Sequence, residues 1–216
     1  MSDDVALQKA VLAELNWDPS VPAGQIGVIA KNGVITLTGE TNSYFGKHAA
    51  ETAAGRIQGV TAIAEEIKVV LDHHVRHEDT DIAAAAAARL ASNGSIPKSR
   101  IIPHVEQGWV TLHGELDWQF ERDAAEQEIR PIEGVVGVMN MITVKPRVDV
   151  FDVRQDIRDA LHRSSLFDVD TIRVEVDGST VRLSGNVASI HDRKIAESIA
   201  WAAPGAVKVE NRLEIA

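Results

Sequence analysis

The segments VITLTGE (34–40), VTLHGE (110–115) and VRLSGN (181–186) repeat one pattern along the chain and determine how it folds. Each alternates apolar and polar residues, which is typical of a strand with one buried face, and each contains a glycine near its end. A second glycine follows 20 residues after the first, which gives the pairs Gly39 and Gly59, Gly114 and Gly134, and Gly185 and Gly205. The copies are spaced by 75 and 71 residues, so the chain contains an internal repeat.

Apolar residues upstream of these segments keep the same register. Residues four apart lie on one face of a helix, and each copy has three apolar residues at that spacing. They are Leu7, Val11 and Leu15 in the first copy, Ile82, Ala86 and Leu90 in the second, and Val153, Ile157 and Leu161 in the third. A register kept at this many positions indicates three copies of one module, which we place at residues 3–72, 78–146 and 149–216.

Each module is predicted to contain five elements in the order αββαβ. The first helix is expected at 4–15, 79–91 and 150–163, and the first strand at 25–30, 100–105 and 171–176. A turn containing glycine leads into the repeated segment, which is the second strand. The second helix is expected at 43–57, 118–131 and 189–202, and the last strand at 60–70, 135–145 and 206–215.

This order defines the fold class. Strands joined by a tight turn are antiparallel, whereas the strand after the second helix arrives by a crossover and is parallel to its neighbour. The predicted class is therefore α+β, with each module a small three-stranded mixed sheet packed against two helices. A module of this size is near the lower limit for an independent core, so we expect neighbouring modules to share surface in a compact or semi-rigid array.

Composition excludes several classes of function. The 216 residues carry a net charge of −10, which argues against nonspecific nucleic-acid binding, because that binding requires clustered cations. Cysteine is absent, so disulfides and thiolate chemistry are excluded. No apolar run approaches the roughly 18 residues of a transmembrane helix. The acidic amino-terminal stretch has no signal-peptide pattern, so the expected compartment is the cytoplasm.

The repeated pattern resembles the BON domain. The resemblance rests on GVITLTGE (33–40), on an Ala-Glu pair in each following helix, and on PGAVKVENRLEI (204–215). The third copy fits the pattern best, and the first has Glu65 where the others have Asn140 and Asn211. The resemblance implies a transport-associated αββαβ module without catalytic residues. It also implies a role in bacterial envelope and osmotic-stress proteins, commonly exported, with phospholipid as a ligand.

The glycines and histidines have structural interpretations. Gly39, Gly114 and Gly185 suit a strand-to-helix turn or a close backbone approach, because a phosphate-binding loop would need several glycines opening a helix. His73, His74 and His77 lie in one linker, and their spacing could present two imidazoles to a metal. We expect a solvated linker instead, because no second histidine follows at zinc-hydrolase spacing. We therefore expect no catalytic residue, no cofactor and no metal.

The start of the second helix is the predicted binding site. A cation recurs there, at Lys47, Arg122 and Arg193, although the helix dipole disfavours positive charge at that end. One interpretation is an ion pair with Glu51, Glu126 or Glu197 four residues later. The other is that the cation and the free helix N–H groups hold an anion, such as a lipid phosphate. Neighbouring aromatic residues suit a membrane interface; they are Tyr44, Phe45, Trp118 and Phe120.

These observations predict a non-enzymatic binding protein made of three modules. The first hypothesis is association with phospholipid, a membrane surface or an envelope partner in a stress response. The second is a protein-interaction or chaperone-like module without lipid affinity, which would use sheet edges and apolar grooves. A third is binding of a small ion at the junctions between modules. Nucleic acid is not an expected partner, and the sequence leaves the oligomeric state open.

Overall fold

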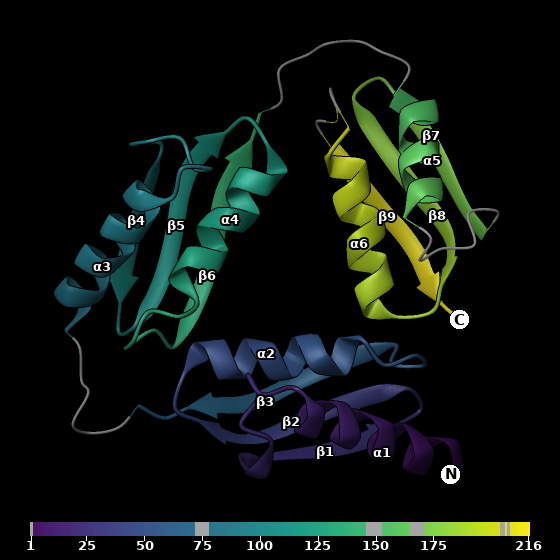
Figure 1. Ribbon diagram of the computed structural model, residues 1–216, viewed down its shortest axis with the longest axis horizontal. Helices are drawn as coiled ribbons and strands as arrows, with labels where there is room; N and C mark the ends of the chain where they lie inside the picture. The colour runs from purple at the N-terminus through teal and green to yellow at the C-terminus, as the bar shows by residue number, and fades with distance from the viewer. Residues whose placement is uncertain (1, 72–77, 146–152, 165–170, 204–205, 207) are drawn as a thin grey trace.

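The structure is a computed structural model that describes residues 2–71, 78–145, 153–164, 171–203, 206 and 208–216. It consists of three modules arranged around a common centre (Figure 1). The first module contains α1 (Ser2–Trp17), a short 3-10 turn (Ala23–Gln25), β1 (Ile26–Lys31), β2 (Val34–Thr41), α2 (Tyr44–Gly55) and β3 (Ala62–Val69). The second contains α3 (Asp79–Ser92), β4 (Ile101–Glu106), β5 (Trp109–Leu116), α4 (Gln119–Ile129) and β6 (Gly137–Val144). The third contains α5 (Val153–Arg163), β7 (Ile172–Asp177), β8 (Thr180–Val187), α6 (Ile190–Trp201) and β9 (Lys208–Ile215).

The sheet topology confirms the predicted α+β fold. Within the described residues each module has its own three-stranded sheet, in the orders β1-β2-β3, β4-β5-β6 and β7-β8-β9. The repeated segment is the central strand, antiparallel to the first strand and parallel to the last. The sheets do not join, so the repeat unit of the sequence is also the packing unit of the structure.

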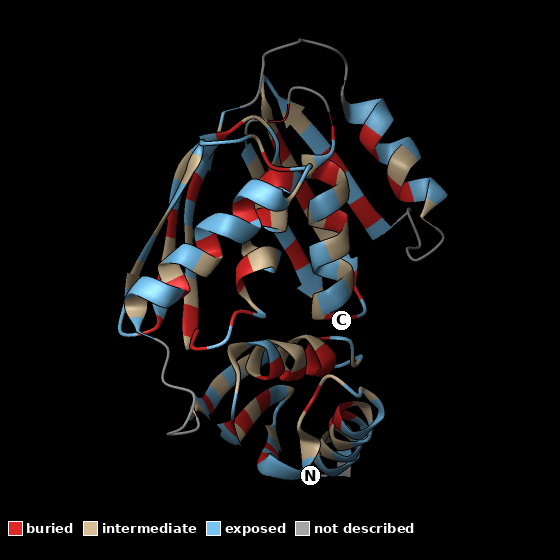
Figure 2. Cartoon of the chain, turned by 60° about the vertical axis from the view of Figure 1, so that its left-hand side comes forward, coloured by how far each residue is buried: buried red, intermediate tan, exposed pale blue. Residues whose placement is uncertain are grey.

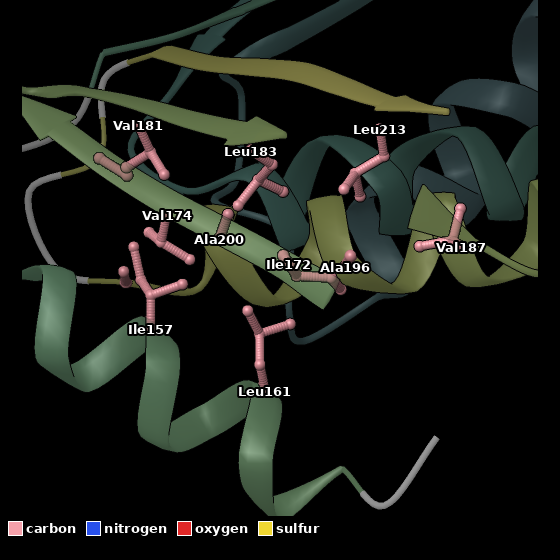
Figure 3. Close-up of a cluster of buried hydrophobic side chains, with 12 residues drawn as sticks. Ile157, Leu161, Ile172, Val174, Val181, Leu183, Val187, Ala196, Ala200 and Leu213 are labelled. Atoms are coloured by element: carbon pink, nitrogen blue, oxygen red, sulfur yellow. The ribbon is translucent and has the colours of Figure 1, made fainter. Parts of the chain in front are cut away.

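Each module also has its own hydrophobic core. Most of the helix positions read from the sequence are buried: Val11 and Leu15 in α1, Ile82, Ala86 and Leu90 in α3, and Ile157 and Leu161 in α5. Leu7 is partly buried, and the side chain of Val153 lies outside the described part of the structure. In the third module, Ile157 and Leu161 meet Leu183 of the central strand and Ala200 of α6 (Figure 3). Buried residues lie between helices and sheets, and exposed residues lie on the outer surfaces (Figure 2).

The repeated glycines lie inside the central strand, not at the strand-to-helix turn that was one of the two predicted roles. Gly39 pairs with Ile26, and Gly114 with Ile101, in the antiparallel register. A Cβ atom at Gly114 would overlap the carbonyl oxygen of Arg100, so the predicted close backbone approach is the role that the structure supports. The later glycines Gly59 and Gly134 have positive φ values of 85° and 90°, while Gly205 lies outside the described residues.

The second helices form a head-to-tail ring at the centre of the molecule. Figure 1 shows α2, α4 and α6 facing this centre, one from each module. Tyr44, the first residue of α2, packs against the core of the second module. Ile190, the first residue of α6, packs against the core of the first module and lies beside Gly55 at the end of α2. The start of α4 and the end of α6 line a shared pocket. Each second helix therefore meets the next module with its amino-terminal end.

Candidate functional site

The recurring cations fasten the second helix to the last strand. Lys47 Nζ donates to the carbonyl oxygen of Ile67 at 2.9 Å and pairs with Glu65 Oε2 at 2.7 Å. Arg122 Nη2 donates to the carbonyl oxygen of Asn140, and Arg193 Nη2 donates to that of Asn211, both at 3.2 Å.

The predicted pairing of these cations with the glutamate four residues later is wrong for the described contacts. In the second module, Asn140 Nδ2 donates to Glu126 Oε2 at 3.2 Å and to the carbonyl oxygen of Arg122 at 3.1 Å. Asn211 makes the same two bonds, to Glu197 at 3.0 Å and to Arg193 at 3.1 Å. The reason is geometric: the strand residue reaches both partners across the helix–strand gap, and the cation bonds the strand backbone.

The first module has Glu where the other modules have Asn, and this side chain contacts the cation differently. Glu65 occupies the strand position of Asn140 and Asn211, and it pairs with Lys47 where the other modules use arginine. All three strand residues also accept a hydrogen bond from the backbone N–H two residues later, at 2.7 Å for Glu65, 3.3 Å for Asn140 and 3.2 Å for Asn211. Lys47, Arg122 and Arg193 therefore have a structural use in each module.

The aromatic residues near these cations have different environments. Tyr44 is half-buried against the second module, where a backbone group of Val138 hydrogen-bonds to it, and burial raises the pKa of its phenol. Phe45 is 46% exposed, Trp118 is 40% exposed and Phe120 is 58% exposed. Of the four aromatic residues beside these cations, Phe45, Trp118 and Phe120 are therefore accessible to a ligand.

Trp118 occupies a position that serine fills in the other modules. Ser43 Oγ accepts a hydrogen bond from the N–H of Gly46 at 3.2 Å, and Ser189 Oγ accepts one from Asp192 at 3.1 Å. These are ordinary helix N-caps. In the second module, Glu121 reaches back and accepts hydrogen bonds from the N–H groups of Asp117 and Trp118 at 3.2 and 3.1 Å. Glu121 therefore binds the backbone before the helix, whereas the serines of the other modules cap an N–H group inside the first turn.

A cavity of about 750 Å³ lies at the centre of the helix ring. One face of each second helix lines it, and the residues there are equivalent in the repeat. One equivalent set is His48, Asp123 and Lys194, and another is Thr52, Gln127 and Ser198. The cavity therefore combines groups of both charge signs with neutral polar groups.

Several charged side chains around this cavity are paired with neighbouring side chains of opposite charge or with polar groups. Arg56 Nη1 contacts Glu14 at 3.1 Å and Asp18 at 3.0 Å. The imidazole of His48, whose Nδ1 lies 3.7 Å from Glu51 Oε2, lowers the pKa of Glu51 despite the opposing effect of burial. Burial raises the pKa of Asp123, and a hydrogen bond from Gln119 opposes that shift. Asp123 is an exposed residue of α4, and its pKa is raised, whereas that of Asp18 in the same lining is lowered.

A second cavity, of about 250 Å³, lies between the start of α4 and the end of α6. Trp118, Phe120 and Trp201 line it together with Asp123, and the remaining lining residues are Gln119, Ser198 and Ala202. Neither Trp201 nor Asp123 is among the site residues expected from the sequence. The register offered one signal, since Asp123 is equivalent to His48 and Lys194 on a helix face turned away from its own sheet. The contact between α4 and α6 in the helix ring joins residues that are far apart in the sequence, so no local sequence pattern predicts it.

The open face of the second sheet is a further accessible surface. Four large apolar side chains project from it: Ile102 (69% exposed), Trp109 (52%), Met139 (50%) and Met141 (54%). At the equivalent positions the first module has Gly27, Val34, Ala64 and Glu66, and the third has Arg173, Thr180, Glu210 and Arg212.

The third module shows how its equivalent face is made polar. Glu210 contacts Lys208 at 2.8 Å, Arg182 at 3.1 Å and Arg212 at 2.7 Å. Hydrogen bonds from Lys208, then Arg182 and Arg212, lower the pKa of Glu210 to about 2. The same strand positions therefore carry a charge network in one module and an apolar surface in another.

The linker histidines His73, His74 and His77 lie outside the described residues. Among the side chains that are described, no three His, Asp or Glu residues cluster as metal ligands would. None of the helices in the described ranges is long and apolar enough to span a bilayer.

Comparison with known proteins extends these observations. A family model described as the BON domain matches residues 3–70, 78–146 and 149–216. The osmotically-inducible protein Y of Escherichia coli (strain K12) is 26% identical over 153 residues, covering 66% of this chain and 73% of that protein. The 21 kDa hemolysin of Actinobacillus pleuropneumoniae is 29% identical over 143 residues, covering 65% and 73%.

A solved structure of CdsD, a structural protein of the type III secretion system of Chlamydia trachomatis, aligns over 95% of this chain and 90% of its own. Its sequence identity is 13% and its TM-score is 0.26, so that likeness carries no argument. The family match covers the chain three times and coincides with the three αββαβ units of the structure. The chain therefore belongs to the BON domain family and contains three copies of the domain.

Proposed function

We propose that this protein is a non-enzymatic binding protein of an osmotic-stress response, which associates with phospholipid at a membrane surface through the open sheet face of its middle module. The stress response is suggested by the similarity to the osmotically-inducible protein Y. The observation that carries the binding surface is the contrast among the three equivalent sheet faces.

The middle face has the character of a contact surface. The cross-strand register places Met141 opposite His113, which pairs in turn with Ile102, and it places Met139 opposite Thr111. Exposed apolar side chains grouped on one face mark interaction surfaces, because each loses unfavourable contact with water on binding. Trp109, the first residue of the central strand β5, adds an amphipathic ring of the kind that favours the boundary between water and lipid.

The proposed association depends on apolar contact more than on charge. The chain has a net charge of −10, so long-range attraction to anionic lipid is unfavourable. The helix-start cations Lys47, Arg122 and Arg193 are already engaged with strand groups. We therefore expect association that changes little with ionic strength, in contrast to binding driven by basic patches.

Vesicle flotation with a transplanted charge pair tests this function. The variant Met139→Glu with Met141→Arg introduces the residues found at Glu210 and Arg212, which the same fold accommodates in the third module. The matched control, Ala64→Glu with Glu66→Arg, places the same pair on the first module. We expect wild type and control to float with phospholipid vesicles at low and physiological salt, and the middle-module variant to remain unbound.

Equal flotation of both variants would contradict the assigned surface. If the wild-type protein does not float at either salt concentration, lipid is not the ligand and the protein-interaction hypothesis is favoured.

A further inference from the structure

The three junctions of the helix ring differ in how they are filled. At one junction Tyr44 packs against the second module, and at another Ile190 packs against the first. The equivalent residue at the third junction is Gln119, which is polar, and a cavity of about 250 Å³ lies between α4 and α6 there. The third junction therefore has an opening where the other two have an apolar side chain.

The lining of this opening is aromatic on several sides. Trp118 and Phe120 come from the start of α4, and Trp201 comes from the end of α6. The structure describes seven aromatic side chains, and three of them line this one cavity. Aromatic faces carry negative partial charge and attract cations within about 6 Å, most strongly when the cation is weakly hydrated.

The polar groups of the cavity also favour a cation. Asp123 accepts a hydrogen bond from Gln119 Nε2 at 3.0 Å, and within the described part of the chain it forms no ion pair. The other amide atom of this residue, Gln119 Oε1, is buried and has no hydrogen-bond donor among the described residues. A carboxylate without an ion-pair partner and a buried carbonyl oxygen without a donor disfavour an anionic ligand and would be stabilised by positive charge.

We propose that the cavity between α4 and α6 binds a small alkylated ammonium ion, held by the faces of Trp118, Phe120 and Trp201 and by the carboxylate of Asp123. The cavity volume suits one such group, because pockets for drug-sized molecules start at roughly 300 Å³. This site is separate from the sheet face assigned to membrane contact. A trialkylated ammonium group occurs in free solutes and in lipid headgroups, and both sources would offer the same chemistry.

Titration with tetramethylammonium, followed by tryptophan fluorescence and calorimetry, tests the site. The neutral control is 3,3-dimethylbutan-1-ol, which has a similar bulk without charge. We expect saturable binding of tetramethylammonium and none of the alcohol at the same concentrations. Asp123→Asn keeps the side-chain shape and removes the charge, so we expect it to weaken binding at least about tenfold. Equal binding of the alcohol, or unchanged binding by Asp123→Asn, would overturn the proposal.

Two further variants keep the test independent of folding defects. Lys194→Asn changes the equivalent position of the third module, which lines the large cavity but not the small one, and we expect it to bind as wild type. Phe120→Leu removes one exposed ring and keeps apolar bulk, so we expect an unchanged melting temperature and weaker binding. A general electrostatic effect would strengthen tetramethylammonium binding in Lys194→Asn, because this variant removes a positive charge. Loss of binding in Lys194→Asn to the same extent as in Asp123→Asn would therefore show a response of the whole helix ring and would overturn the assigned site.

The two sources of the ammonium group are distinguished by competition. Binding of soluble phosphocholine, displaced by tetramethylammonium, together with unchanged flotation of Asp123→Asn on phosphatidylcholine vesicles, would identify a free solute. Reduced flotation of Asp123→Asn on those vesicles, but not on vesicles lacking choline, would identify the headgroup. The sheet-face variant Met139→Glu with Met141→Arg should retain tetramethylammonium binding, so failure of one proposal does not imply failure of the other.

Discussion

At the scale of single residues, the repeated glycine is determined by the neighbouring backbone. Gly114 lies in the central strand opposite Ile101, where the chain of the first strand approaches too closely for a side chain. Gly39 and Gly185 have the same crowding and φ values of 126° and 121°. The recurrence predicted either a close backbone approach or a strand-to-helix turn. It could not distinguish between the two, because both need a residue without Cβ.

Gly114→Ala should therefore destabilise its module by about 1–3 kcal/mol, because the added methyl group overlaps the carbonyl oxygen of Arg100. The matched control is Gly94→Ala, since an added Cβ there has nothing within 4 Å and φ is not positive. Urea unfolding measures both free energies. Similar unfolding curves for the two variants would show that the close approach at Gly114 relaxes without cost.

At the scale of elements, each second helix is attached to its last strand by a cation and a strand side chain that vary together. Lys47 is combined with Glu65, Arg122 with Asn140, and the third module repeats the arginine–asparagine combination. The sequence displayed the recurring cation and the exchange of asparagine for glutamate. It did not indicate their contact, because the partners are 18 residues apart on different elements and no local spacing rule connects them.

Transplanting one combination into another module tests this coupling. Glu65→Asn should destabilise the first module because it removes the carboxylate that pairs with Lys47. Lys47→Arg should destabilise it because a larger guanidinium must fit the contact that a compact ammonium group makes with Glu65. The double variant recreates the combination of the second module, so we expect a coupling free energy of about 0.5–3 kcal/mol in its favour. A double-mutant cycle from thermal or urea unfolding gives this value. Strict additivity would mean that the two side chains act independently.

At the scale of the whole molecule, the modules form a ring that places three equivalent helix faces around one cavity. Alternation, helix spacing and glycine turns predicted the modules because those signals are local. The ring depends on contacts such as Ile190 with Gly55, which are distant in sequence and involve side chains that also suit an ordinary exposed helix. Trp201 and Asp123 acquire a shared cavity only through that closure, which explains why sequence reasoning did not bring them together.

The ring is tested most directly by a disulfide between the first and third modules. The chain has no cysteine, and a Cβ atom added at Gly55 lies 3.6 Å from Ile190 Cβ, within the roughly 3.5–4.5 Å that a disulfide requires. The test variant is Gly55→Cys with Ile190→Cys. The control is Gly55→Cys with Arg173→Cys, whose second thiol lies on the exposed sheet of the third module.

After mild oxidation of the dilute protein, we expect the Gly55→Cys, Ile190→Cys variant to lose both free thiols and to form an intramolecular disulfide. The cross-linked chain is more compact when denatured, so it should migrate faster on a non-reducing gel than after reduction. The control pair should keep both thiols reactive toward maleimide. Free thiols in the Gly55–Ile190 variant under these conditions would contradict the ring.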